Sequence, residues 1–152
     1  MSDLLIPFVE WGFLGGIIAM GMLFHFFDEP LHRKRSLTEA EIQSHLMDSI
    51  AFVICFALAL WARYDMRLFW LYFGSAVFAG LLTFKDELNH HENCTPQERL
   101  VHALMFTLNG IIFILAGLII LLHLPVLYIE LALLGSLGTY IWQIYYWSLR
   151  ER

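Results

Sequence analysis

Five stretches of the chain are almost free of charged residues, and polar segments separate them. The apolar stretches cover residues 4–27, 46–62, 68–84, 100–123 and 126–147. A transmembrane helix needs about 20 predominantly apolar residues, and roughly 17–25 are tolerated. The pattern therefore predicts an all-α, polytopic membrane protein with five transmembrane helices, folded as a single membrane domain over residues 1–152.

The composition supports this interpretation. Hydrophobic residues make up 59% of the chain, charged residues only 15%, and the formal net charge is −5. Soluble domains carry about 25% charged residues, so an ordinary soluble domain is excluded, as are a disordered chain and a nucleic-acid-binding protein with a basic surface. The N-terminus lacks the basic segment and the cleavage site of a signal peptide, and we expect it to form the first span.

The distribution of Lys and Arg predicts an orientation. With five spans, the 28–45 loop, the 85–99 loop and the C-terminus share one face of the membrane. Seven of the nine basic residues belong to that face, namely Arg33, Lys34, Arg35, Lys85, Arg99, Arg150 and Arg152. Cytoplasmic loops carry the excess of Lys and Arg, so we expect the N-terminus outside and this face inside, in a bacterial inner membrane.

The two polar loops contain an internal repeat. Residues 28–32 (DEPLH) align with residues 86–90 (DELNH) at an offset of 58, and residues 38–45 (TEAEIQSH) align with residues 95–102 (TPQERLVH) at an offset of 57. The repeat predicts a duplicated helical hairpin, with copies at about 4–62 and 68–123, that forms a four-helix bundle. The span 126–147 is then an extra C-terminal helix.

The repeat places Glu and His at equivalent positions. Residues three or four apart share one helix face, so each of four helix ends offers one Glu and one His to the same side. The predicted metal ligands are Glu29, His32, Glu41, His45, Glu87, His90, Glu98 and His102. Two divalent cations would cancel the charge of the four carboxylates when the imidazoles are neutral. The sequence thus predicts a dinuclear metal site at the cytoplasmic mouth of the bundle.

Four further residues are predicted to support these ligands. Asp28 and Asp86 precede His32 and His90 by four residues, a spacing that suits a carboxylate accepting the second imidazole N–H. Asp48 and His25 are expected to tune the pocket, although His25 fits a helix-packing role equally well.

Two other interpretations of the motifs remain open. Thr38 with Glu41, and Thr95 with Glu98, have the spacing of capping boxes, although capping alone leaves the following histidines unexplained. Pro30 predicts a kink before His32, which would distort the first half of the site.

The constellation resembles the carboxylate-bridged di-iron bundle proteins, in which two helices each supply a Glu and two supply Glu-x-x-His. Residues 29–32 and 87–90 match the Glu-x-x-His element, and Glu41 and Glu98 take the place of the lone Glu residues. This chain departs from the pattern because His45 and His102 add two nitrogen ligands. The resemblance implies iron, while a Glu and His ligand set without thiolate also suits zinc or manganese.

These features lead to three functional hypotheses. The first is a di-iron oxidoreductase that uses oxygen on a lipid-soluble substrate, with an electron donor and membrane lipid as partners. The second is a two-zinc hydrolase of lipids. The third is a non-catalytic membrane subunit of a larger complex, in which the metals staple the two hairpins together and the last helix contacts a membrane-protein partner. The sequence does not assign catalytic residues.

Overall fold

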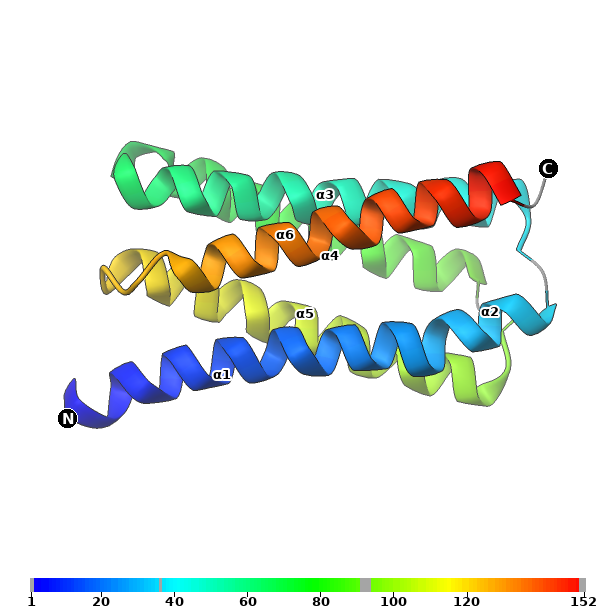
Figure 1. Ribbon diagram of the computed structural model, residues 1–152, viewed down its shortest axis with the longest axis horizontal. Coiled ribbons are helices and arrows are strands. Elements are labelled where there is room, and N and C mark those ends of the chain that lie inside the picture. Colours follow the sequence, from blue (N-terminus) through cyan, green and yellow to red (C-terminus); the bar gives the residue numbers. More distant parts are fainter. Residues whose placement is uncertain (1, 36, 91–93, 151–152) are drawn as a thin grey trace.

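The chain folds into long helices that lie side by side (Figure 1). The computed structural model describes the backbone of residues 2–35, 37–90 and 94–150, and the side chains of residues 4–34, 37–85 and 94–147. The α-helices are α1 (Ser2–Leu23), α2 (Glu29–Arg35), α3 (Glu39–Tyr64), α4 (Phe69–His90), α5 (Pro96–Leu121) and α6 (Leu127–Gln143). No strand occurs in the described ranges, and the predicted all-α class is confirmed.

Three shorter elements join or extend these helices. The π-helix η1 (Phe24–Asp28) connects α1 to α2, the 3-10 helix η2 (Met66–Leu68) leads into α4, and the π-helix η3 (Ile144–Arg150) continues α6. In consequence, α1, η1 and α2 form one continuous helical rod.

Within the described residues, four segments are long and apolar enough to cross a membrane. They are Leu4–Lys34, Glu39–Tyr64, Met66–Lys85 and Pro96–Leu121, and each overlaps one of the first four predicted spans. Large apolar side chains such as Trp11, Trp70 and Ile114 are exposed on the outside of the bundle, where lipid would cover them. The fifth predicted span corresponds to α6, which has only 17 residues, and its membrane crossing stays a prediction.

The helix termini gather at two opposite ends of the bundle (Figure 1). The start of α3, the end of α4, the start of α5 and the end of η3 lie at one end, which we call the histidine end. The start of α1, η2 and the α5–α6 turn lie at the other end. This grouping is the one that five spans require, whereas the side of the membrane that each end faces stays a prediction.

The two loops expected at the histidine end are mostly helical and shorter than predicted, which agrees with the predicted position of Glu and His on helix ends. Within the expected 28–45 loop, α2 runs to Arg35 and α3 begins at Glu39; within the expected 85–99 loop, α4 runs to His90 and α5 begins at Pro96. The helices begin where Thr38 and Thr95 cap them, not where the apolar stretch begins. The histidines therefore lie on helices.

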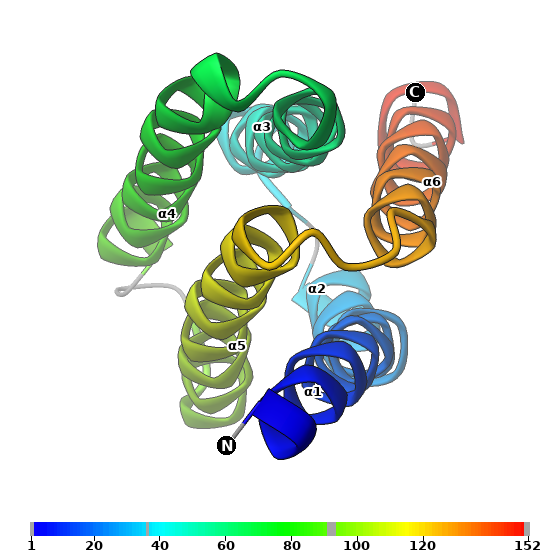
Figure 2. The ribbon, with the colours of Figure 1, turned by 90° about the vertical axis from the view of Figure 1, so that its left-hand side faces the viewer.

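The packing order of the helices brings the two halves of the chain together (Figure 2). α1 packs mainly against α5, α3 packs against α4, and α6 packs along α3 and also contacts α1. Each predicted repeat copy thus packs against a helix of the other copy. The duplication itself stays a prediction.

The contact between α1 and α5 is close at Gly16. A Cβ atom at this position would lie 2.9 Å from Cγ1 of Ile112, whereas a Cβ at Gly15 would meet nothing within 4 Å. We expect Gly16→Ala to lower the free energy of unfolding by about 1–3 kcal/mol through overpacking. Gly15→Ala is the matched control and should be neutral or slightly stabilising. Thermal unfolding in detergent measures the difference, and equal melting temperatures would contradict the packing described.

Candidate metal centre

Asp28 and His32, the first two residues of the site, lie on the rod formed by α1, η1 and α2. Pro30 has no backbone N–H, so a regular helix would lose a hydrogen bond there. The π-helical turn η1 lies directly before α2 and accommodates this irregularity. Such turns interrupt the regular i→i−4 hydrogen bonding of an α-helix without ending the helix. The helix continues beyond Pro30 to Arg35, and His32 therefore stays on the rod.

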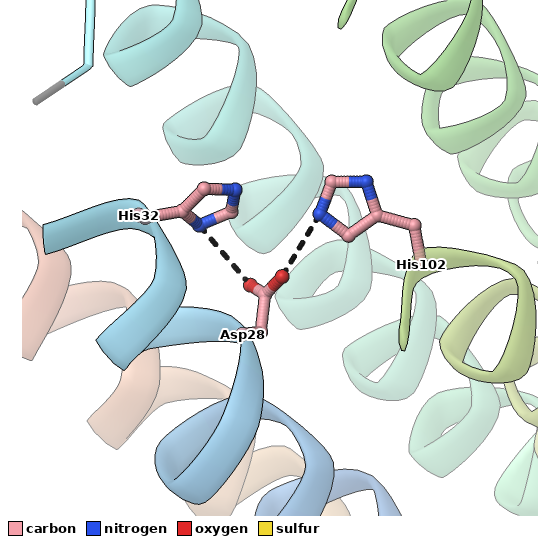
Figure 3. Close-up of side chains that lie close together, drawn as sticks. All are labelled: Asp28, His32 and His102. Carbon is pink, nitrogen blue, oxygen red and sulfur yellow. Dashed lines mark ion pairs between the residues drawn. The ribbon is translucent and has the colours of Figure 1, made fainter. Parts of the chain in front are cut away.

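Asp28, His32 and His102 point toward one another at the histidine end (Figure 3). Oδ2 of Asp28 lies 3.4 Å from Nδ1 of His32, and Oδ1 of Asp28 lies 2.9 Å from Nε2 of His102. One potential ligand atom from each residue lies within 4.8 Å of the others. Asp28 and His32 are each only 2% exposed. The three residues form a compact group of oxygen and nitrogen donors, in which the His102 side chain is the most exposed, at 12%.

A third imidazole adjoins this group. The ring centroid of His45 lies 4.8 Å from that of His32, and the His32 and His102 centroids are 5.4 Å apart. Nε2 of His32 is buried and has no hydrogen-bond partner in the described part of the chain. A buried polar atom without a partner raises the free energy of the fold, and metal coordination would satisfy it. The donor set therefore fits a metal ion.

Asp28 has a more central position than the sequence predicted. It was expected to orient His32 from outside the ligand set, and it does lie beside that imidazole. It also contacts His102, which belongs to α5 and is 74 positions later in the chain. The aspartate of the repeated DExxH motif was the available signal, but its second contact depends on how α1 packs against α5.

Glu29, a predicted ligand, is paired with a cation. Nε of Arg33 donates to Oε1 of Glu29 at 2.6 Å, and the Glu29 side chain is only 5% exposed. The guanidinium lies over the rings of Tyr146 and Trp142, at 4.2 and 5.7 Å from their centroids. Glu29 lies outside the group formed by Asp28, His32 and His102. Its carboxylate charge is balanced by Arg33, which also connects α2 to the C-terminal helical segment.

Glu41 and Glu98 form capping boxes in both repeat copies. The backbone N–H groups of Thr38 and Thr95 donate to Oε2 of Glu41 and Glu98 at 2.7 Å. In return, the threonine hydroxyl oxygens accept from the backbone N–H groups of the two glutamates. The capping interpretation is confirmed. Both glutamates are buried, and their additional role as metal ligands stays a prediction.

The cap of α5 offers a direct stability test. We expect Thr95→Ala to lower the free energy of unfolding by about 0.5–2 kcal/mol, because an orphan N–H at the helix start loses its acceptor. Thr107→Ala is the control in the same helix, since the exposed Thr107 hydroxyl only donates to the carbonyl of Ala103. Chemical denaturation in detergent measures both variants, and a Thr95→Ala loss no larger than that of the control would contradict the cap.

The remaining predicted residues of the second copy lie outside the described side chains. α4 extends as a helix through His90, but the side chains of Asp86, Glu87 and His90 are not among those that the structure describes. Their predicted roles stay predictions.

A cavity of about 520 Å³ adjoins the group. Its wall includes Asp28, His45 and His102 from the site, together with the predicted pocket residues His25 and Asp48. The ring of His25 also packs edge-on against Phe24 and Trp142, so this histidine both lines the cavity and packs between helices. The site is therefore continuous with a space large enough for a small-molecule ligand.

Comparisons with known protein families, with curated proteins and with solved structures give no match for this chain. The class of protein therefore follows from the fold and the site themselves. The part of the chain that the structure describes is a helical bundle with four candidate transmembrane helices and a buried Asp/His/His group that could hold a metal ion.

Proposed function

We propose that this chain is a membrane metalloprotein that binds a metal ion between Asp28, His32 and His102 and carries out oxidoreductase chemistry on a lipid-soluble substrate. The observation that carries the proposal is the buried donor group, in which Nε2 of His32 has no hydrogen-bond partner within the described residues. A structural histidine would normally hydrogen-bond through both nitrogens when buried this deeply.

Iron is our first choice for the metal. A set of two histidines and one carboxylate, with no thiolate, suits iron, zinc or manganese, and sets of this kind that leave open positions are typical of non-haem iron oxygenases. The neighbouring His45, whose ring centroid lies 4.8 Å from that of His32, supports a second ion, for which Glu41, Glu98, Glu87 and His90 stay predicted ligands. Bound iron would supply one-electron and oxygen chemistry, which amino-acid side chains lack.

The residues around the metal would position it and its surroundings. Asp28 links imidazoles from two helices and fixes their separation. The helical rod and α5 supply these groups, and helical segments hold ligands more rigidly than loops do. The adjoining cavity would place a substrate beside the ligands, within a bundle whose outer surface is apolar. These features favour a substrate dissolved in the membrane.

Metal analysis tests the proposal. Detergent-purified wild-type protein should contain at least one equivalent of iron by inductively coupled plasma mass spectrometry, and two equivalents would support the dinuclear form. The His32→Ala and His102→Ala variants should lose the bound iron. His123→Asn is the control, because His123 lies in the turn after α5 at a positive φ of 57° that asparagine tolerates. Folded wild-type protein without metal, or variants that retain it, would contradict the proposal.

Zinc hydrolysis is a second candidate function. Catalytic zinc sites also use three nitrogen and oxygen ligands and keep a position open for water, and the Asp/His/His group satisfies this requirement. Zinc in place of iron in the purified protein, with hydrolysis of a lipid ester, would favour this function. Zinc without turnover, together with unfolding of the ligand variants, would favour the stapling role, since the group connects the α1–α2 rod to α5.

A further inference from the structure

The cavity beside the metal group is long and follows the helix axes. Its wall residues run from Asp28 to Ile17 on the α1–α2 rod and from His45 to Phe56 on α3. They run from Gln143 to Ala132 on α6 over the same eleven-residue interval. Eleven residues of α-helix span about 16 Å at 1.5 Å per residue. This length is close to half of the hydrocarbon thickness of a bilayer, which is about 30 Å in total.

The two ends of the cavity differ in polarity. Asp28, His45, Asp48 and His102 line its end near the metal group. Away from that group the wall is mainly apolar and aromatic, and it includes Ile17, Met20, Phe52, Phe56, Phe106 and Ile112. A ligand that matches this wall has one polar end and one long apolar chain, with the polar end at the histidines.

The charge of the cavity wall determines which lipid headgroups it can accept. Two carboxylates, Asp28 and Asp48, line the cavity, and no Lys or Arg occurs among its described wall residues. One divalent cation at the metal group would balance these two charges, so the wall offers no excess positive charge to an anionic headgroup. The imidazoles and the hydroxyl and amide side chains of the cavity wall, such as Thr139 and Asn109, can hydrogen-bond a neutral headgroup.

We infer that the cavity binds one single-chain lipid with a neutral oxygen-bearing head, such as a long-chain alcohol or aldehyde, and that the head lies next to the metal group. The inference rests on the proposed function for the identity of the substrate class, and the cavity itself is observed independently of any metal. The inference restricts the proposed lipid-soluble substrate to molecules whose chain is about as long as one leaflet is thick. It excludes free fatty acids as preferred ligands.

Two glycines of α6 provide a matched pair of variants. Gly135 lines the cavity and Gly138 does not, and a Cβ at either position would meet nothing within 4 Å. Leucine at position 135 would project into the space that the lipid chain needs. Leucine at position 138 makes the same change on the same helix away from the cavity, and it controls for effects on folding or on membrane insertion.

Photolabelling in lipid nanodiscs tests the inference. A hexadecanol carrying a diazirine in its chain should label residues of the cavity wall, such as Phe52 and Ile112, identified by peptide mass spectrometry. Excess hexadecanol should suppress this labelling at least tenfold more effectively than excess hexadecanoate at pH 8. Gly135→Leu should reduce the labelling of the wall at least fivefold, and Gly138→Leu should leave it unchanged.

Three results would overturn the inference. They are labelling confined to outward-facing residues such as Trp70, equal labelling of the two leucine variants, and equal competition by hexadecanoate. Metal content measured on the same samples separates the two proposals. Metal-loaded protein without cavity labelling contradicts the lipid inference alone, whereas cavity labelling of folded, metal-free protein contradicts the metal-centred function alone.

Discussion

Asp28→Asn should weaken metal binding by more than 100-fold while leaving the helices folded. The substitution keeps the size of the side chain and removes the charge that lies between His32 and His102. If Asp28 only orients His32, the loss should stay within the 10- to 100-fold range that is typical of residues supporting a ligand. The size of the effect therefore distinguishes a direct ligand from an orienting residue.

Competition with a chelator of known affinity measures this effect on metal-loaded protein, and circular dichroism confirms that the helices remain. Asp48→Asn is the matched comparison, because Asp48 lines the same cavity and lies outside the group of Asp28, His32 and His102, and it should weaken metal binding less than Asp28→Asn does. Wild-type affinity in the Asp28→Asn variant would contradict a role for this carboxylate in metal binding.

Arg33→Ala should destabilise the protein by about 1–3 kcal/mol. The substitution leaves the Glu29 carboxylate, which is 5% exposed, without its cation. Breaking a buried ion pair by removing one partner typically costs about 3–5 kcal/mol. The expected value is smaller because the Arg33 side chain is 44% exposed and solvent screens its charge. The variant also loses the stacking of the guanidinium on Tyr146 and Trp142, which attaches α2 to the C-terminal segment.

A double-mutant cycle separates these contributions. Adding Glu29→Gln to Arg33→Ala should recover part of the lost stability, because it removes the uncompensated charge. Arg67→Ala is the control, since Arg67 pairs with Asp65 at the opposite end and the two side chains are 90% and 39% exposed. Equal destabilisation by Arg33→Ala and Arg67→Ala would show that burial of Glu29 has no energetic consequence.

The secondary structure followed closely from local signals. Charge-poor stretches of adequate length identified the first four spans, because chain length and apolarity are what a bilayer requires of a helix. The capping boxes were also readable, since Thr38 with Glu41 and Thr95 with Glu98 interact over three residues of chain. The boundaries of the polar segments were predicted poorly. The end of an apolar stretch shows where the chain leaves the membrane, whereas the capping residues show where the helix itself begins.

The partners of the charged residues were harder to predict. A helical spacing of three or four residues gave Glu29 access to both His32 and Arg33, and the sequence did not decide between these two partners. Residues at positions i+3 and i+4 compete for the carboxylate at position i, and small differences in geometry decide which of them pairs with it. The aromatic rings of Trp142 and Tyr146 favour this position of Arg33, and they come from the far end of the chain.

The sequence by itself determined that this protein is helical, that its long helices suit a membrane, and that histidines and acids recur near the same helix ends, because each of these properties depends on residues close together in the chain. Only the tertiary structure decided that Asp28 lies between His32 and His102, and that a long cavity begins beside them. Both features require α1, α3, α5 and α6 to pack in one particular order, and packing depends on the fit of distant side chains, which helical periodicity does not encode.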